Sequence, residues 1–233
     1  MRILIIGNIL KDVYLNLDER QNKFETDESG TPWMDVAFNG ESHPYFSRTS
    51  VFGGATVTLE VLRKLGINAS ISGAEDGKAD AYRYILTYED KITYVTPSER
   101  PETNFIAPNE PVDWVFVDRS TEISNELVEK IKNHIGLTRS KLAVFINTKR
   151  MVNVRYSEAT KELIRNATVV FADGELVDVT SNGVICTISE NEIKCGSIVR
   201  RYKVSKNDLM THLTTFSIIS ATIFGGMING TST

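Results

Sequence analysis

Two short groups of residues near the N-terminus could contact an oxygen-rich ligand. Gly53-Gly54 precedes a segment with helical spacing, and glycines let backbone amides approach a group bound at a helix N-terminus. Asp12 follows the apolar run 2–7, at the position where open α/β sheets bind ligands. The alternative for both groups is a structural turn or cap, a common role of glycine and aspartate.

The elements that must position these residues alternate between strands and helices. The strands are predicted at residues 2–7, 13–17, 68–72, 92–95, 103–106, 113–117, 142–146, 169–171, 183–189 and 192–194. The helices are predicted at residues 55–65, 79–86, 124–135, 157–165, 175–180 and from 208 onward. The polar stretch 21–49 is predicted as loops and short strands. This alternation predicts one α/β sandwich domain over residues 1–233, with a mainly parallel sheet.

The composition favours a soluble protein that handles a small molecule or binds a partner. The 233 residues suffice for one sizeable domain, and 41% are hydrophobic and 24% charged. A formal net charge of −4 argues against a nucleic-acid or anionic-membrane partner. The apolar run 2–7 is too short for a signal peptide, so we expect a cytoplasmic protein.

The two cysteines flank a predicted tight turn. If residues 186–189 and 192–195 form a hairpin, Cys186 and Cys195 face each other across it. Because no secretory signal is visible, we expect free thiols that pack together.

The C-terminal segment carries no charged residue from Leu209 onward. Its apolar part, 216–228, is interrupted by hydroxyl residues and by Gly225-Gly226, and it is short for a bilayer span. We therefore expect a buried helix here.

Several of these segments together resemble the ribokinase (PfkB) family of carbohydrate and nucleoside kinases. The matching segments are Ile3-Leu4-Ile5-Ile6-Gly7 with Asp12, Phe52-Gly53-Gly54-Ala55, Leu62-Arg63-Lys64-Leu65-Gly66 and Ile71-Ser72-Gly73-Ala74-Glu75-Asp76-Gly77. The resemblance implies a ribokinase-like three-layer sandwich with a small β lid, contributed by residues 12–18 and 90–108.

The resemblance also implies a sugar site. In that family the first-strand aspartate and the double glycine hold sugar hydroxyls, which are the roles of Asp12, Gly53 and Gly54 here. Thr58 replaces the family's asparagine in the following helix. Arg150 matches the last residue of an Asp-x-Asn-x-Arg pattern, and a solvated strand-end arginine is the alternative.

The nucleotide side departs from the family pattern. Where family members carry Asn-x-x-Glu, which organises magnesium and phosphates, this sequence has Asp173, with Glu175 one place before the glutamate position. A family Thr-x-Gly that meets the nucleotide corresponds to Thr187-Ile188-Ser189. ATP and Mg²⁺ are therefore implied as cofactors, with Asp173, Glu175 and Thr187 as nucleotide-side residues.

The family's phosphate cradle, Asp-Thr-Thr-Gly-Ala-Gly-Asp-Thr-Phe, corresponds to residues 208–216. Its two glycines fall on Thr211 and Leu213, and its catalytic aspartate falls on Thr214. A threonine hydroxyl is a poor general base at neutral pH, and loss of such a base costs about 10²–10⁴-fold in rate.

Two neighbouring titratable residues could replace the missing base. They are His212 and Asp208, although Asp208 also suits a helix cap. His43 and His134 are predicted in a loop and on a polar helix face, with no metal-ligand spacing.

Three functional hypotheses follow. The first is a degenerate family member, a pseudokinase that binds a sugar- or nucleoside-like ligand without efficient phosphoryl transfer. The second is an active ATP-dependent sugar or nucleoside kinase with a displaced base. The third is a dimeric scaffold that pairs through its lid and has no small-molecule site.

Overall fold

The computed structural model describes residues 1–17, 25–26, 32–33, 46–74, 78–88, 91–95, 102–103, 105–148, 156–189, 191–201 and 209–230. The chain forms two compact units. The first comprises Met1–Leu10, Phe52–Ala81 and Arg100–Thr233, and the second comprises Lys11–Val51 and Tyr82–Glu99.

The first unit is built on an eight-stranded sheet with the order β14-β13-β12-β11-β10-β9-β1-β6. The strands are β1 (Arg2–Ile6), β6 (Asn68–Ile71), β9 (Trp114–Val117), β10 (Lys141–Ile146), β11 (Val169–Ala172), β12 (Val184–Ile188), β13 (Glu192–Cys195) and β14 (Ile198–Arg201). Neighbouring strands from β6 to β12 are parallel, and β13 and β14 extend the sheet antiparallel. The predicted mainly parallel sheet is therefore confirmed.

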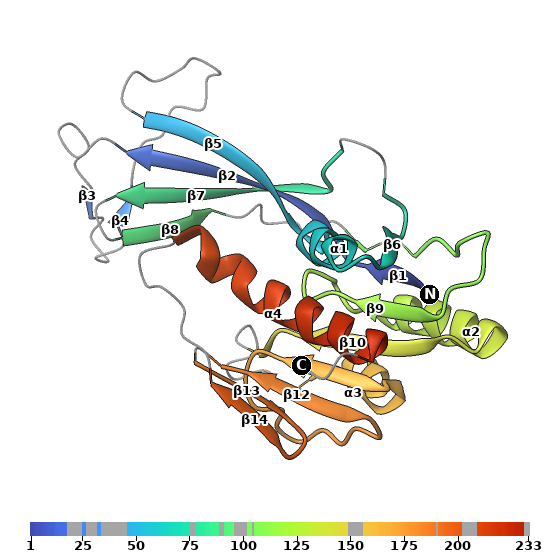
Figure 1. The fold of residues 1–233 in the computed structure, drawn as a ribbon. Helices are drawn as coiled ribbons and strands as arrows, with labels where there is room; N and C mark the ends of the chain where they lie inside the picture. The colour runs from blue at the N-terminus through green and yellow to red at the C-terminus, as the bar shows by residue number, and fades with distance from the viewer. Residues whose placement is uncertain are drawn as a thin grey trace. The chain divides into compact units, whose positions relative to one another are not determined.

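Helices cover both faces of this sheet (Figure 1). The helices α1 (Ala55–Lys64) and α4 (Leu209–Asn229) pack on one face, and α2 (Asn125–Thr138) and α3 (Glu158–Asn166) pack on the other. The central strands are apolar in nearly every residue because both of their faces are buried. This arrangement gives the three layers that the sequence predicts.

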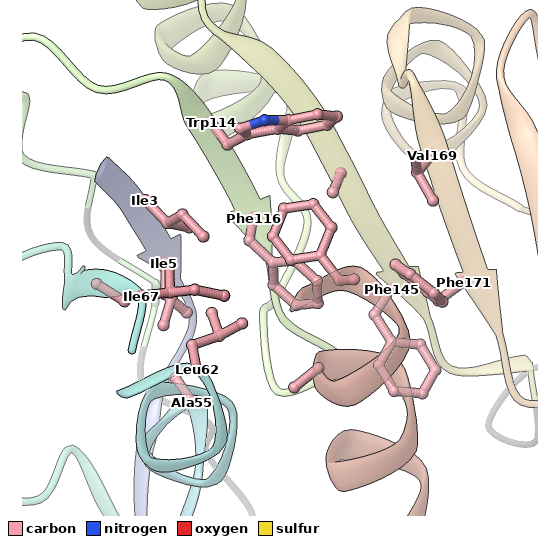
Figure 2. Close-up of a cluster of buried hydrophobic side chains, with 14 of the residues drawn as sticks. Ile3, Ile5, Ala55, Leu62, Ile67, Trp114, Phe116, Phe145, Val169 and Phe171 are labelled. Carbon is pink, nitrogen blue, oxygen red and sulfur yellow. The ribbon is translucent and has the colours of Figure 1, made fainter. Parts of the chain in front are cut away.

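The core between the sheet and α4 is rich in aromatic rings. Figure 2 shows Trp114, Phe116, Phe145 and Phe171 projecting from adjacent strands into one apolar cluster. Phe224 of α4 joins them, with ring centroids 5.1 Å from Trp114 and 5.0 Å from Phe116. The uncharged C-terminal segment thus forms the predicted helix, which over 216–230 buries one face, with Phe216, Ala221 and Phe224, against the sheet. Among the described helices none is long and apolar enough to span a membrane.

A glycine allows α4 to approach α1 closely. A Cβ at Gly225 would collide with Leu65 and lie 3.2 Å from Cδ1 of Ile67. Gly225 is therefore a packing residue, which explains a glycine inside an otherwise apolar helix.

The second unit contains most of a four-stranded sheet with the order β5-β2-β7-β8. These strands are β5 (Phe46–Gly54), β2 (Ile9–Leu17), β7 (Ala81–Tyr88) and β8 (Lys91–Val95), and a separate pair is formed by β3 (Glu25–Thr26) and β4 (Pro32–Trp33). The small sheet agrees with the predicted fold class. That residues 12–18 and 90–108 act as a lid of one domain stays a prediction.

Some local predictions are wrong. Residues 79–86 were predicted as a helix, but 81–86 form most of β7, because the alternating tyrosines and Thr87 suit a pleated strand. The described residues among 103–106 form no strand, and residues 175–180 form no helix. The stretch 21–49, predicted as loops and short strands, contains β3, β4 and the start of β5. The continuation of β5 to Gly54 and the strand β14 were missed, since they give no clear alternation.

The cysteine pair lies where the sequence places it but is oxidised. Cys186 of β12 and Cys195 of β13 are directly opposed, with Cα atoms 4.1 Å apart. Their sulfurs form a disulfide, so the expectation of free thiols is wrong. The hairpin was expected to juxtapose the thiols, but the inferred reducing compartment was given more weight than this geometry.

His134 is also not where the sequence predicts. It lies on the buried face of α2 and is only 8% exposed. Its ring packs edge-on against Phe105 at 5.5 Å, and its Nε2 has no hydrogen-bond partner among the residues that the structure describes. Burial lowers the pKa of His134, so the folded protein favours the neutral ring.

Candidate functional site

Gly54 makes a close backbone contact at the start of α1. It adopts φ 62°, and the N–H of the following Ala55 donates to the carbonyl oxygen of Asn8 at 3.1 Å. A Cβ at Gly54 would collide with that oxygen and lie 3.1 Å from Cγ of Leu10. The close approach observed at Gly54 is to the chain's own backbone after β1, and the predicted approach of the two glycines to a ligand stays a prediction.

The N-terminus of α1 has no side-chain cap and no acidic residue in its first turn. The first N–H groups of a helix lack partners within the helix, and they favour negatively charged or oxygen-rich groups. The N–H groups of this terminus can therefore donate hydrogen bonds to the oxygens of a polar ligand, the role predicted for the two glycines.

Thr58 is held in an internal network. Its Oγ1 donates to Oδ2 of Asp118 at 2.6 Å, and both residues are buried. The other carboxylate oxygen of Asp118 accepts from N and Oγ of Ser120, at 2.9 and 2.7 Å. Thr58 thus ties α1 to the end of β9, and its predicted sugar contact stays a prediction.

Three other predicted sugar-side or catalytic positions are described only partly or not at all. Asp12 is buried in β2 and belongs to the second unit, so its contribution beside the glycines stays a prediction. Arg150 and Asp208 lie outside the described residues.

Asp173, predicted on the nucleotide side, forms a buried ion pair with Arg119. Its Oδ2 lies 2.9 Å from Nη2 of Arg119, and its side chain has no exposed area. Its Oδ1 accepts from the backbone N of Thr148 at 2.6 Å and from its Oγ1 at 2.9 Å. Both carboxylate oxygens are thus bound by groups of the chain itself.

Arg119 is packed between aromatic rings. Its guanidinium carbon lies 5.6 Å from the ring centroid of Phe145 and 5.6 Å from that of Phe216 on α4. Guanidinium groups stack favourably on aromatic faces, and partial desolvation strengthens the contact. The pair therefore links the ends of β9 and β11 to the first half of α4.

The negative charge of Asp173 also affects the pKa of the nearby Tyr156. Burial, followed by the negative charge of Asp173, raises the pKa of Tyr156. Tyr156 is therefore a neutral hydrogen-bonding group at physiological pH.

Glu175 and Thr187 line one cavity of about 670 Å³. The loop after β11 and the hairpin β12–β13 form its walls, including Lys194, which is directly opposite Thr187. The remaining lining residues are Gly174, Gly183, Val184, Ile185, Ile188, Ser189, Glu192 and Gly196. The structure thus brings together two predicted nucleotide-side residues, whereas Asp173 does not line this cavity.

The positions that correspond to the phosphate cradle lie inside α4. Because α4 begins at Leu209, Thr211 and His212 belong to its first turn, and Leu213 and Thr214 belong to its second. Backbone N–H groups beyond the first four bond within the helix, so those of Leu213 and Thr214 are engaged. The side chains of these four residues lie outside the description.

In the part of the chain that is described, no three His, Cys, Asp or Glu side chains are grouped to hold a metal ion. Magnesium is usually held by one or two carboxylates together with phosphates and water. Asp173 does not fit that role, since an arginine already neutralises it.

Arg119, Asp118 and Ser120 were missed by sequence-based reasoning. They follow directly after the apolar strand β9, at the carboxyl edge where parallel sheets gather polar groups. That placement was readable from the sequence. The partners of Asp118 and Arg119 were not, because they come from α1 and from the end of β11.

Sequence comparison gives no match, either to a model of a protein family or to a curated protein. Comparison with solved structures gives clear matches. The chain is similar to a ribokinase from Cryptococcus neoformans var. grubii serotype A in complex with ADP, at 10% identity and a TM-score of 0.65. That match covers 100% of this chain and 89% of the other.

Two nucleoside kinases give similar matches. One is from Burkholderia thailandensis, in complex with inosine, at 11% identity, a TM-score of 0.61 and coverage of 99% of this chain and 85% of that one. The other, an archaeal member of the ribokinase family from Methanocaldococcus jannaschii, matches at 12% identity, a TM-score of 0.60 and coverage of 98% and 85%. The chain therefore has the ribokinase fold, as its sequence predicts.

Proposed function

We propose that this chain is a ribokinase-fold protein that binds a sugar- or nucleoside-like molecule and does not transfer phosphate efficiently. The observation that carries this proposal is the Arg119–Asp173 ion pair. A nucleotide site needs its carboxylates to balance magnesium and to organise phosphates. Here Asp173, at the position of the family's asparagine, is buried and already paired, and Glu175 lies one place before the position of the family's glutamate.

The path of α4 supports the same proposal. Phosphoryl transfer asks the protein for positioning and for stabilisation of charge on the phosphate oxygens. At Leu213 and Thr214 the backbone N–H groups bond inside the helix, and neither residue supplies a carboxylate base. The chain thus keeps the fold but lacks, at these two positions, the free backbone N–H groups and the carboxylate base that phosphoryl transfer uses.

The ligand-binding half of the proposal is supported by the start of α1. The uncapped terminus after Gly54 and the buried Asp12 are the groups that the resemblance assigns to sugar hydroxyls. Sugars and nucleosides both present hydroxyl groups, and the solved relatives include a nucleoside kinase in complex with inosine. A homodimer through residues 12–18 and 90–108 also stays a prediction.

Ligand-dependent thermal unfolding tests the proposal. A ligand at about 100 times its Kd stabilises the folded state by about 2.7 kcal/mol, which raises the Tm measurably. We expect a shift with one or more members of a panel of pentoses, hexoses and nucleosides, without ATP. An enzyme-coupled assay for ADP release should then show no turnover above background.

Turnover of ATP with any panel member would contradict the non-catalytic proposal. His212→Ala in such an active protein would then test whether histidine is the displaced base. No shift with any member would contradict ligand binding and favour the scaffold alternative.

Matched variants identify the cavity's part in nucleotide binding. If ATP or ADP shifts the Tm, Glu175→Gln and Thr187→Val should reduce that shift. Glu60→Gln, on the exposed face of α1, is the control and should not.

A further inference from the structure

The strand β14 forms an open end of the eight-stranded sheet. It pairs with β13, and in the described part of the chain no strand pairs with its outer edge. All four of its residues are exposed, including the apolar Ile198 (55%) and Val199 (45%). Figure 1 shows β14 beyond β13, away from the central strands. An exposed edge with apolar residues is a template for a further strand.

The hairpin register determines which backbone groups face outward. The turn between β13 and β14 has two residues, Gly196 and Ser197, and Gly196 has φ 58°. Such a turn makes Cys195 and Ile198 a hydrogen-bonded pair, and the ladder alternates from there. The N–H and C=O groups of Ile198 and Arg200 therefore point to β13, whereas those of Val199 and Arg201 point to the open edge.

The side chains of β14 repeat one pattern on both faces of the sheet. Ile198 and Arg200 are opposite Cys195 and Ile193, on the face that carries α4. On the other face, Val199 and Arg201 are opposite Lys194 and Glu192. Each face of the strand thus presents an aliphatic residue followed by an arginine.

Among the described residues, the arginines of β14 have one acidic partner, Glu192. Glu192 lies 3.7 Å from Arg201, but the arginine side chain is 88% exposed, and an exposed pair of this kind contributes little. Lys194 adds a further positive charge on the same face as Arg201. The edge is therefore a basic spot on a chain whose net charge is −4.

We propose that β14 is a docking edge for an extended acidic segment of a partner protein, which adds a ninth strand to the sheet. The partner strand places two adjacent aliphatic residues beside Ile198 and Val199, and two adjacent carboxylates beside Arg200 and Arg201. Backbone bonds to Val199 and Arg201 supply affinity, and the charge pairs supply selectivity.

A second copy of this chain fits the edge less well. In an antiparallel pair of two β14 strands, outward-pointing residues must lie opposite one another. With Val199 opposite Arg201, Arg200 of each copy lies directly opposite Arg200 of the other, and with Val199 opposite Val199 the two Arg200 side chains are diagonal neighbours. Like charges at such positions oppose pairing. An acidic strand replaces each repulsion with an attraction.

Peptide binding to the full chain tests this proposal. The probes are fluorescent, end-capped peptides with two valines followed by two glutamates, or the reverse order, since the strand direction is open. Fluorescence anisotropy should show binding by one of them, weaker as salt rises from about 0.05 to 0.5 M. The same peptides with lysine for glutamate should not bind.

Two variants test the two contributions separately. Arg200→Glu with Arg201→Glu should weaken binding about ten-fold or more, while Lys64→Glu, on α1, should not. Val199→Pro removes an outward N–H without removing a bond to β13, so it should abolish binding at little change in Tm. Val199→Thr keeps that N–H and is the control.

Absence of binding by both acidic peptides would overturn the proposal and leave the arginines as protection against edge pairing. Undiminished binding to Val199→Pro would exclude strand addition. A dimer in analytical ultracentrifugation that Arg200→Glu with Arg201→Glu alters would make a second copy the occupant, which also overturns it.

Discussion

The guanidinium of Arg119, just after β9, lies 2.9 Å from the carboxylate of Asp173, just after β11. The pair spans the end of β10, which lies between these two strands in the sheet. Asp173 is wholly buried and Arg119 is 20% exposed, so the pair is shielded from water. In the family that the sequence resembles, an Asn-x-x-Glu motif at this edge organises magnesium and phosphates, and Asp173 stands at the position of its asparagine. In this chain the guanidinium of Arg119 binds the carboxylate of Asp173 instead.

Arg119→Met should destabilise the protein strongly, because it leaves a buried carboxylate unpaired. The expected loss in the free energy of unfolding is about 3–5 kcal/mol, measured by urea denaturation. Adding Asp173→Asn should recover part of that loss by removing the charge. Arg165→Met, which affects an exposed pair at 3.9 Å, is the control and should change stability by less than about 0.5 kcal/mol.

Gly54→Ala should destabilise the protein more than Gly66→Ala. Both glycines have positive φ, 62° and 75°, so both variants carry backbone strain of about 1–3 kcal/mol. Only at Gly54 does a Cβ also collide with a backbone oxygen, that of Asn8, whereas Gly66 has open space around it. Equal Tm values for the two variants would contradict the close contact.

Acid should destabilise the wild type partly through His134. Burial lowers its pKa in the folded state, so the unfolded state binds the proton more readily. The neutral histidine's contribution is therefore fully present above its unfolded pKa, about 6.5, and is lost as the pH falls through that value towards the lower folded one.

His134→Gln removes this titration and isolates its effect. The difference in unfolding free energy between wild type and variant should shrink from pH 7.5 to pH 5. A pH-independent difference would show that His134 does not titrate between the two states.

Reduction of the disulfide should loosen the edge hairpin. Cys186 and Cys195 are separated by 9 positions, and a loop of that size corresponds to about 2–3 kcal/mol of stabilisation. Urea denaturation with and without a phosphine reductant measures this difference. The variant with alanine at both cysteines should not respond to reductant, and thiol alkylation before reduction should label no cysteine in the wild type.

Much of the fold was predictable because burial on both faces leaves a plain pattern. The strands β1, β9, β10 and β11 are short apolar runs, and Ser124 and Ser157 cap α2 and α3, with side chains that accept from Leu127 N and Thr160 N. In strands that are not buried on both faces, the sequence pattern is less distinct and the prediction fails. β7 was read as a helix, because its spacing alone did not distinguish a pleated strand from an amphipathic helix.

The sequence by itself determined an α/β fold with a mainly parallel sheet and the glycine pair before α1, which follow from periodicity and residue identity over a few neighbouring positions. Its resemblance to the ribokinase family indicated the ribokinase fold, and it predicts that Thr211, Leu213 and Thr214 replace the family's glycines and aspartate. Only the tertiary structure decided the partners of buried polar groups: Arg119 for Asp173, Asp118 for Thr58 and Cys195 for Cys186. Their physical reason is that a buried charge or hydroxyl must be paired, and the partner comes from whichever distant strand or helix the fold brings beside it.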